Sequence, residues 1–285
     1  MNLKKRIISV AVGFVLLALI FWLINTWVLN VVLAIFSVLA VFEALRALRM
    51  NDNILALVLY VGAGILGVLL AVDMIFFVFG LLLLTFCLIM FSQNRHYTFK
   101  EGAAAYVMTL TVVLGLRAIL RLRGLFIEPW DMRFALLIAL ALGWICDTFA
   151  FFFGFWLGKR KLCPAISPKK TVAGAVAGLI GTPIVITGVY LLYTNIAPGQ
   201  SVFYLMNDFP KLAFFFGVGL LGAAIGMVGD LAASFVKREC GVKDFGNLIP
   251  GHGGALDRLD SVLFTAVFAL AAFEIYFRLF VLLGV

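Results

Sequence analysis

Long apolar runs alternate with short polar connections along almost the whole chain. The runs reach about 20 residues, which is the length an α-helix needs to cross the hydrocarbon core of a bilayer. They predict about nine membrane-spanning helices, at residues 7–24, 27–45, 54–72, 74–91, 103–120, 133–157, 172–194, 212–236 and 261–283. The sequence lacks the short alternating segments of a transmembrane β-barrel. We therefore expect an all-α, polytopic membrane protein.

The composition agrees with a membrane protein and excludes an ordinary soluble domain. Of the 285 residues, 65% are hydrophobic and 13% are charged, and the mean hydropathy is +1.16. Soluble domains are about 25% charged. No Pro- or Ser-rich linker interrupts the chain, so we expect a single membrane-embedded domain over residues 1–285. Within it we distinguish an N-terminal helical half (1–130) and a catalytic half (131–285) that carries a polar motif at 229–260.

Basic residues in the short connections predict the orientation in the membrane. Lys and Arg collect on the cytoplasmic side of inner-membrane proteins, and most basic connections here fall on one predicted side, whereas residues 195–210 on the other side contain none. We expect a multi-pass protein of the cytoplasmic (inner) membrane with its N-terminus and polar loops in the cytoplasm. Four arginines fall on the opposite side and indicate either a re-entrant or interfacial helix or a miscounted span: Arg117, Arg121, Arg123 and Arg133.

Two residue types limit the remaining interpretations. The four cysteines are scattered without C-x-x-C spacing, so neither a zinc site nor a disulfide framework is indicated. Three G-x-x-x-G pairs predict close helix packing within the chain, with a homodimer interface as the alternative: Gly154/Gly158, Gly174/Gly178 and Gly222/Gly226. The net charge of +8 follows mainly from the membrane topology, and we expect no nucleic-acid partner.

Two aspartates, Asp147 and Asp230, lie inside apolar runs. A charged side chain at the bilayer centre costs about 2.5–3.5 kcal/mol on insertion scales. The functional interpretation is a metal, proton or substrate site. The structural interpretation is an ion pair with Lys or Arg that joins neighbouring helices.

The stretch Gly229–Asp260 holds five of the fourteen acidic residues of the chain. Asp230, Ser234, Lys237 and Arg238 follow one another at helical spacing and are expected to project from one helix face. The basic pair closes the predicted eighth span. This face is therefore a candidate for binding anionic groups.

The same stretch continues through a loop with Lys243 and a glycine-rich turn around His252, then re-enters the membrane at Asp257 and Asp260. Because the two spans form a hairpin, we expect Asp230 and Asp257 to return to a similar depth. Converging carboxylates suit Mg²⁺, whose remaining positions substrate phosphates can fill. Backbone N–H groups around His252 suit phosphate oxygens.

In this order the residues resemble the phosphatidate cytidylyltransferase family, also called CDP-diacylglycerol synthase. The matching residues are Gly229-Asp230, Ser234, Lys237-Arg238, Lys243-Asp244, Pro250, His252-Gly253-Gly254, Asp257-Arg258 and Asp260. A second matching stretch comprises Asp147, Gly158-Lys159, Ser167-Pro168-Lys169-Lys170-Thr171 and Gly174. The resemblance covers the C-terminal half closely and extends weakly to Phe42-Glu43. Ala173, Phe245 and Ala255 depart from residues that are frequent in the family.

The resemblance implies transfer of the cytidylyl group from CTP to phosphatidate, giving CDP-diacylglycerol and pyrophosphate in phospholipid biosynthesis. We expect Asp230 and Asp257 to bind Mg²⁺, with Asp260 or Asp147 contributing and a second cation as an open alternative. Contacts to the triphosphate or the lipid head group are expected from Lys237, Arg238, Lys243 and Arg258, with Ser234 on the same helix face. A second phosphate clamp is expected from Ser167, Lys169 and Lys170, and His252 either orients a phosphate or supports its turn.

Two other functions would also use these residues. An ion-coupled secondary transporter would use Asp147 and Asp230 as coupling sites near the membrane midplane. A CTP-dependent lipid kinase would transfer the terminal phosphoryl group instead of the cytidylyl group. The sequence shows no internal repeat and crowds its polar residues into one loop, which favours the transferase.

Overall fold

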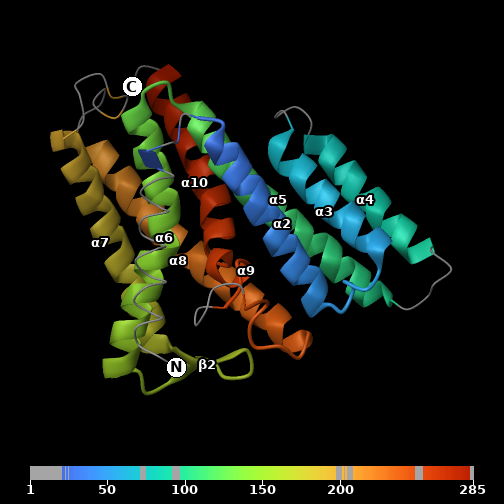
Figure 1. The fold of residues 1–285 in the computed structure, drawn as a ribbon. Helices are drawn as coiled ribbons and strands as arrows, with labels where there is room; N and C mark the ends of the chain where they lie inside the picture. The colour runs from blue at the N-terminus through green and yellow to red at the C-terminus, as the bar shows by residue number, and fades with distance from the viewer. Residues whose placement is uncertain are drawn as a thin grey trace. The chain divides into compact units, whose positions relative to one another are not determined.

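The computed structural model describes residues 21–22, 24, 26–70, 75–91, 97–196, 201, 203, 208–247 and 253–282. These residues are mainly helical (Figure 1). The first helices are α2 (Val28–Ala47), α3 (Ile54–Leu69), α4 (Ile75–Phe91) and α5 (Phe99–Leu125). They are followed by α6 (Pro129–Leu157), α7 (Val172–Ile196), α8 (Asp208–Glu239), α9 (Leu256–Leu259), α10 (Val262–Tyr276) and a π-helical turn, η3 (Phe277–Leu282).

The helices confirm a polytopic membrane protein. Six segments are long and apolar enough to cross a bilayer: Val28–Ala47, Phe99–Leu125, Pro129–Leu157, Val172–Ile196, Phe209–Glu239 and Leu256–Leu279. The apolar helices α3 and α4 are shorter than a typical span. The predicted first span, 7–24, lies almost entirely outside the described residues, so the count of nine stays a prediction.

One element is not helical and was not predicted. Between α6 and α7 the chain forms a two-stranded antiparallel hairpin of β1 (Lys161–Cys163) and β2 (Ser167–Thr171). Lys161 pairs with Thr171, and Cys163 pairs with Ser167. The described residues are otherwise all-α, as predicted, and the hairpin gives the predicted basic connection a regular structure of its own.

The arginine-rich segment forms neither a re-entrant break nor a separate interfacial helix. Helix α5 continues to Leu125, and α6 begins at Pro129. Arg117 donates to the carbonyl oxygens of Gly67 and Leu70, at 2.7 and 3.0 Å, where α3 ends. The carbonyls at a helix C-terminus have no partner within the helix, so a guanidinium there is stabilising. Arg121 pairs with Glu274 at 3.3 Å.

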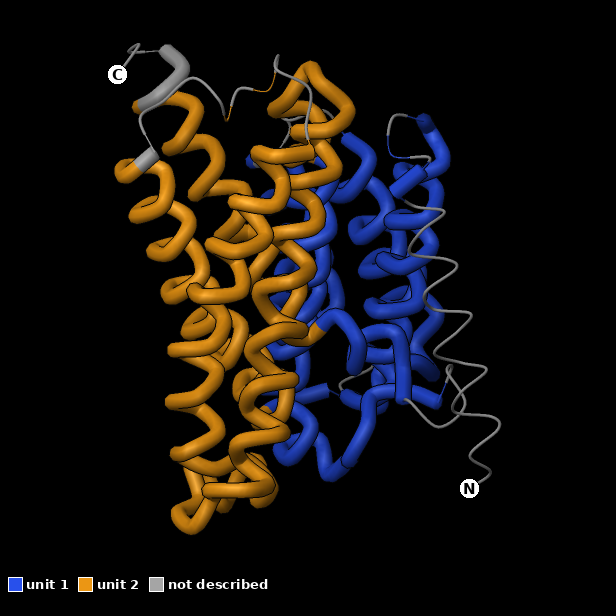
Figure 2. Tube along the Cα trace, turned by 90° about the vertical axis from the view of Figure 1, so that its left-hand side faces the viewer, with its two compact units in different colours: residues 1–120, 236–259 blue, residues 121–235, 260–285 orange. Residues whose placement is uncertain are grey.

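The described chain divides into two compact units (Figure 2). Unit 1 comprises residues 1–120 and 236–259, and unit 2 comprises residues 121–235 and 260–285. Unit 1 thus holds α2, α3, α4 and residues 236–259 of the polar stretch, whereas unit 2 holds α6, the hairpin, α7 and α10. The polar stretch contributes residues to both units.

The core of unit 2 is aromatic at one end and glycine-rich at the other. Phe134, Phe203, Phe215, Phe273 and Tyr276 are buried in one cluster. The G-x-x-x-G pairs pack inside the chain: Gly174 against Ala150 and Gly154, Gly178 against Cys146, Gly222 against Leu142, and Gly226 against Gly143 and Thr265. These contacts confirm the intramolecular interpretation, and none of the described glycine contacts supports a homodimer.

Gly174→Ala should destabilise the fold, whereas Gly188→Ala on the same helix should not. A Cβ at Gly174 would overlap the carbonyl oxygen of Ala150, and backbone atoms cannot easily move aside. Overpacking of this kind costs about 1–3 kcal/mol. At Gly188 a Cβ meets no atom within 4 Å, so alanine should stabilise the helix by about 0.5–1 kcal/mol. Unfolding in detergent micelles measures both, and an equal effect of the two changes would contradict this packing.

Candidate active site

The hairpin of unit 2 borders a cavity of about 190 Å³. Its polar lining comes from Asp147 on α6 and from Lys169, Lys170 and Thr171 on β2. Thr171 ends the hairpin and is buried, and its hydroxyl accepts a hydrogen bond from the N–H of Gly174 at 3.2 Å. This contact ties the basic strand to the first turn of α7. The hairpin therefore holds two lysines at the mouth of a cavity that contains a carboxylate.

Lys170 forms an ion pair with Asp230 of α8. The two side chains are only 22% and 20% exposed, so the pair is largely shielded from solvent. Asp147 lies within electrostatic range of both members. The two aspartates predicted from their place in apolar runs are thus brought together near Lys170. The ion pair at Asp230 is what the structural interpretation predicted, and the functional interpretation stays a prediction.

Asp260 belongs to the same unit. A Cβ at Gly229 would lie 3.1 Å from the backbone oxygen of Asp260 and would overlap the ring of Phe264. Glycine at 229 therefore lets α8 approach the start of α10, next to Asp230. The carboxylate of Asp260 accepts the N–H of Ser261 at 2.8 Å.

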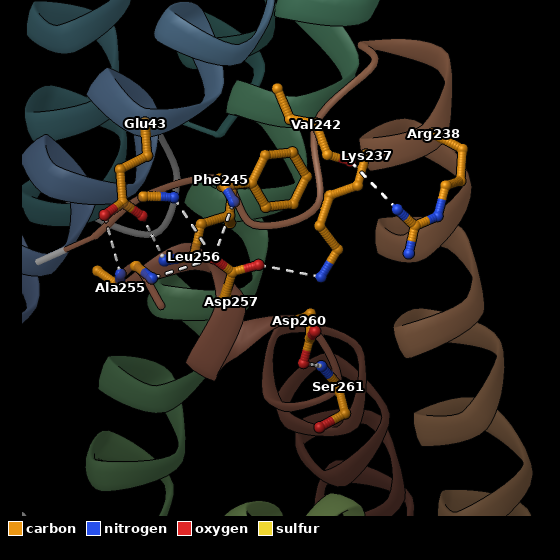
Figure 3. Close-up of polar contacts among 12 residues, drawn as sticks. Glu43, Lys237, Arg238, Val242, Phe245, Ala255, Leu256, Asp257, Asp260 and Ser261 are labelled. Atoms are coloured by element: carbon orange, nitrogen blue, oxygen red, sulfur yellow. Dashed lines mark hydrogen bonds and ion pairs between the residues drawn. The ribbon is translucent and has the colours of Figure 1, made fainter. Parts of the chain in front are cut away.

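In unit 1, Asp257 is the centre of a hydrogen-bonded loop (Figure 3). Its Oδ1 pairs with the ammonium of Lys237 at 3.0 Å. Its Oδ2 accepts the backbone N–H groups of Phe245 at 2.8 Å, Gly254 at 3.0 Å and, more weakly, Gly246 at 3.4 Å. The side chains of Lys237 and Asp257 are 10% and 5% exposed. The ring of Phe245 also faces the Lys237 ammonium, 5.3 Å from its centroid.

Glu43 contacts this loop from another part of the chain and was not among the predicted site residues. It lies on α2 and is buried, and its two oxygens accept the N–H groups of Ala255 and Leu256 (Figure 3). An acidic residue in an apolar run was the signal that singled out Asp147 and Asp230. The same signal at Glu43 would have identified it.

The remaining predicted residues have less constrained surroundings. Ser234 is half-buried on α8, and Ser167 is half-buried in β2 at its pairing with Cys163. The other predicted phosphate contacts are exposed, as binding groups for a diffusible anion must be: Lys169, Arg238, Lys243 and Arg258. His252 lies outside the described residues, and its predicted role stays a prediction.

The predicted site residues fall into two groups. Asp147, Lys169, Lys170 and Asp230 belong to unit 2, whereas Lys237 and Asp257 belong to unit 1. The convergence of Asp230 with Asp257 stays a prediction, since each unit is described by itself.

The donor set of unit 2 fits a hard divalent cation. Mg²⁺ is usually held by one or two carboxylates together with water and substrate phosphates. Asp147 supplies one such carboxylate to the cavity, and Asp230, which is paired with the cavity residue Lys170, supplies a second one within electrostatic range of Asp147. No cluster of three or more His, Cys, Asp or Glu side chains suited to a metal occurs among the described residues. A cation held by these two carboxylates would take its remaining ligands from water or from substrate phosphates.

Comparison with known proteins identifies the family of this chain. The sequence pattern of the Cytidylyltransferase family matches residues 4–276. The chain belongs to the cytidylyltransferase family. A relative from Staphylococcus saprophyticus named phosphatidate cytidylyltransferase is 33% identical over 248 residues, which cover 82% of this chain and 87% of the relative.

Two further relatives of the same name match over shorter regions. The protein from Haemophilus influenzae is 39% identical over 163 residues, covering 57% of this chain and 52% of the relative. The protein from Staphylococcus aureus strain COL is 34% identical over 173 residues, covering 61% of this chain and 59% of the relative. The matched regions thus span between half and two thirds of these two relatives.

Two departures from the family pattern lie in the Asp257 loop. Phe245 and Ala255 are both buried, and both use their backbone N–H groups to bind a carboxylate. The contacts of these residues with the carboxylates are made by the backbone and do not depend on side-chain identity. Ala173 lies in the first turn of α7, and nothing in the structure explains its substitution.

Proposed function

We propose that this protein is a phosphatidate cytidylyltransferase, which forms CDP-diacylglycerol and pyrophosphate from CTP and phosphatidate. The single observation that supports this most strongly is the shielded Lys170–Asp230 pair, beside Asp147 and at a cavity with Lys169. It brings lysines of the hairpin close to carboxylates of α6 and α8, and relatives in the family carry that name.

In the proposed reaction, a phosphate oxygen of phosphatidate attacks the α-phosphorus of CTP. A new P–O bond forms to the lipid phosphate, the bond from the α-phosphorus to the oxygen that bridges to the β-phosphate breaks, and pyrophosphate leaves. Both reactants are anions, so their mutual repulsion dominates the barrier. Positioning and cationic neutralisation therefore supply most of the catalysis that a protein can provide.

The described residues offer groups for both positioning and cationic neutralisation. Lys169 is exposed at the cavity and is proposed to bind a phosphate directly. Lys170 is held by Asp230, so its ammonium is oriented before a substrate arrives. Arg238, Lys243 and Arg258 are exposed and are proposed to contact the triphosphate or the head group, with Ser167, Ser234 and His252 as neutral contacts. Lys237 is paired with Asp257 and is proposed to hold that carboxylate in place.

Magnesium is the proposed cofactor. Asp147 and Asp230 would hold it, and Asp257 and Asp260 are the further ligands expected from the sequence. When bound, it would neutralise charge on the phosphate oxygens, as divalent ions do in phosphoryl and nucleotidyl transfer. A second cation is compatible with this number of carboxylates.

The lipid substrate explains why the site lies on membrane helices. Large apolar side chains are exposed on the helices next to the hairpin, including Phe151, Phe155 and Ile180. Acyl chains can lie against such surfaces while the head group reaches the hairpin lysines. The distribution of Lys and Arg along the chain supports an active site that faces the cytoplasm, where CTP is made, with the protein in the cytoplasmic membrane.

Purified protein incubated with phosphatidate vesicles and CTP labelled at either the α- or the γ-phosphate should transfer only the α-label to lipid. Transfer of the γ-label would indicate a lipid kinase instead. Labelled lipid in neither reaction, from protein that is folded and inserted, would contradict both enzymes and favour a transporter.

A further inference from the structure

Glu43 lies within an apolar helix but is directed at the backbone of a distant loop. Its Oε1 accepts the N–H of Ala255 at 3.0 Å, and its Oε2 accepts the N–H of Leu256 at 2.9 Å. These two N–H groups precede and begin α9. The residue is only 5% exposed. A buried carboxylate is costly, and two backbone donors partly offset that cost.

The loop that Glu43 binds is the loop that holds Asp257. Gly254 donates its N–H to Asp257, and the next two residues donate theirs to Glu43. Successive peptide groups of one turn are therefore fixed by two carboxylates, one from α2 and one from the turn itself. In Figure 3, Glu43 and Asp257 lie on either side of this backbone.

The glycines of the loop fit the same arrangement. A Cβ at Gly246 or Gly254 would overlap the Glu43 carboxylate. Gly253 has a φ of +85°, which favours glycine, and a Cβ there would lie 3.0 Å from Asp257 Oδ2. Gly253 is thus favoured by its positive φ, whereas Gly254 is required because a side chain there would overlap the Glu43 carboxylate.

We infer that Glu43 is a positioning residue of the active site: its carboxylate fixes the Gly254–Leu256 backbone and thereby the place of Asp257. This inference rests on the proposed transferase function for its kinetic consequence, but its structural part stands by itself. Glu43 comes from the N-terminal helices, where the resemblance to the family is weak.

Glu43→Gln tests the inference because the amide keeps the size of the side chain but offers one acceptor instead of two. The amide NH₂ then faces one backbone N–H, which loses its partner. Hydrogen exchange should rise about 10-fold or more in peptides covering residues 243–259 and stay unchanged in peptides of α7. The kcat for CDP-diacylglycerol formation should fall roughly 100-fold, as small misplacements of catalytic groups do. Glu274→Gln, the same change at a glutamate that pairs with Arg121, should alter neither.

Gly254→Ala tests the same contact from the side of the loop. The added Cβ would displace the Glu43 carboxylate, although Glu43 itself is unchanged. The double variant Glu43→Gln/Gly254→Ala should be no slower than the worse single variant, because both changes act on one contact. Multiplicative losses, or exchange that rises equally throughout the protein, would overturn the inference. So would wild-type kcat in Glu43→Gln. If the wild-type protein transfers no cytidylyl group, the proposed function fails, and the local exchange result alone decides whether Glu43 holds the loop.

Discussion

Asp230→Asn should reduce cytidylyl transfer by about 10²–10³-fold while the protein still folds and inserts into the membrane. The change removes the negative charge that orients Lys170 and keeps the shape of the side chain. The tight approach of Gly229 to Asp260 is therefore preserved. The measurement is the rate of CDP-diacylglycerol formation from CTP and phosphatidate, at matched amounts of inserted protein.

A second change separates catalysis from stability at this pair. In Asp230→Asn alone, the shielded Lys170 ammonium lacks its partner, which is destabilising. In Asp230→Asn/Lys170→Met both charges are absent, so stability should recover, because replacing a whole buried ion pair by neutral groups is often neutral. Activity should stay low. Recovery of activity together with stability would show that the pair is structural only.

The matched control is Glu239→Gln on the same helix. Glu239 pairs with Lys100 at 2.6 Å, but the two side chains are 44% and 78% exposed. Exposed ion pairs contribute about 0–1 kcal/mol. This variant should keep near wild-type transfer.

Asp257→Asn should lower transfer roughly 100-fold and loosen the Phe245–Leu256 loop. An amide can offer its oxygen to the backbone N–H groups that now bind Oδ2, but its NH₂ then faces the Lys237 ammonium, which also donates. The unpaired charge of Lys237 is shielded from solvent, so the disturbance should appear as faster hydrogen exchange in residues 243–259.

Lys237→Met in the Asp257→Asn background should restore much of the exchange protection without restoring transfer. Asp52→Asn, an exposed aspartate in a turn of unit 1, serves as the control and should leave both measurements unchanged. Protection that stays lost in the double variant would contradict the Lys237–Asp257 contact as its cause.

Long apolar runs were sufficient to predict these helices, because a helix that crosses a lipid bilayer requires an uninterrupted apolar stretch. Seven predicted spans, 27–45 through 212–236, each overlap one described helix from α2 to α8. The ends were less predictable. Helix α5 extends past residue 120 to Leu125, since its arginines are used within the fold, by the end of α3 and by Glu274. The hairpin at Lys161–Thr171 was missed because its five-residue strand alternates too briefly to give a pattern.

The cost of charge in the membrane singled out Asp147 and Asp230, and the structure brings these two residues within electrostatic range of each other. The ion pair of Asp230 with Lys170 could not be predicted in the same way, because Lys170 lies on a hairpin that the sequence did not predict. Glu43 and Asp257 are separated by more than 200 residues, and their shared loop depends on backbone donors that carry no sequence signature. Such contacts follow only from the tertiary structure.

Pyrophosphate release measured together with lipid product tests the central proposal most directly. Wild-type protein in phosphatidate vesicles with CTP and Mg²⁺ should release one pyrophosphate for each CDP-diacylglycerol formed, and none when phosphatidate is omitted. Asp230→Asn should suppress both products in parallel. Formation of CDP and a phosphorylated lipid without pyrophosphate, or lipid product formed at an undiminished rate by Asp230→Asn, would contradict the account.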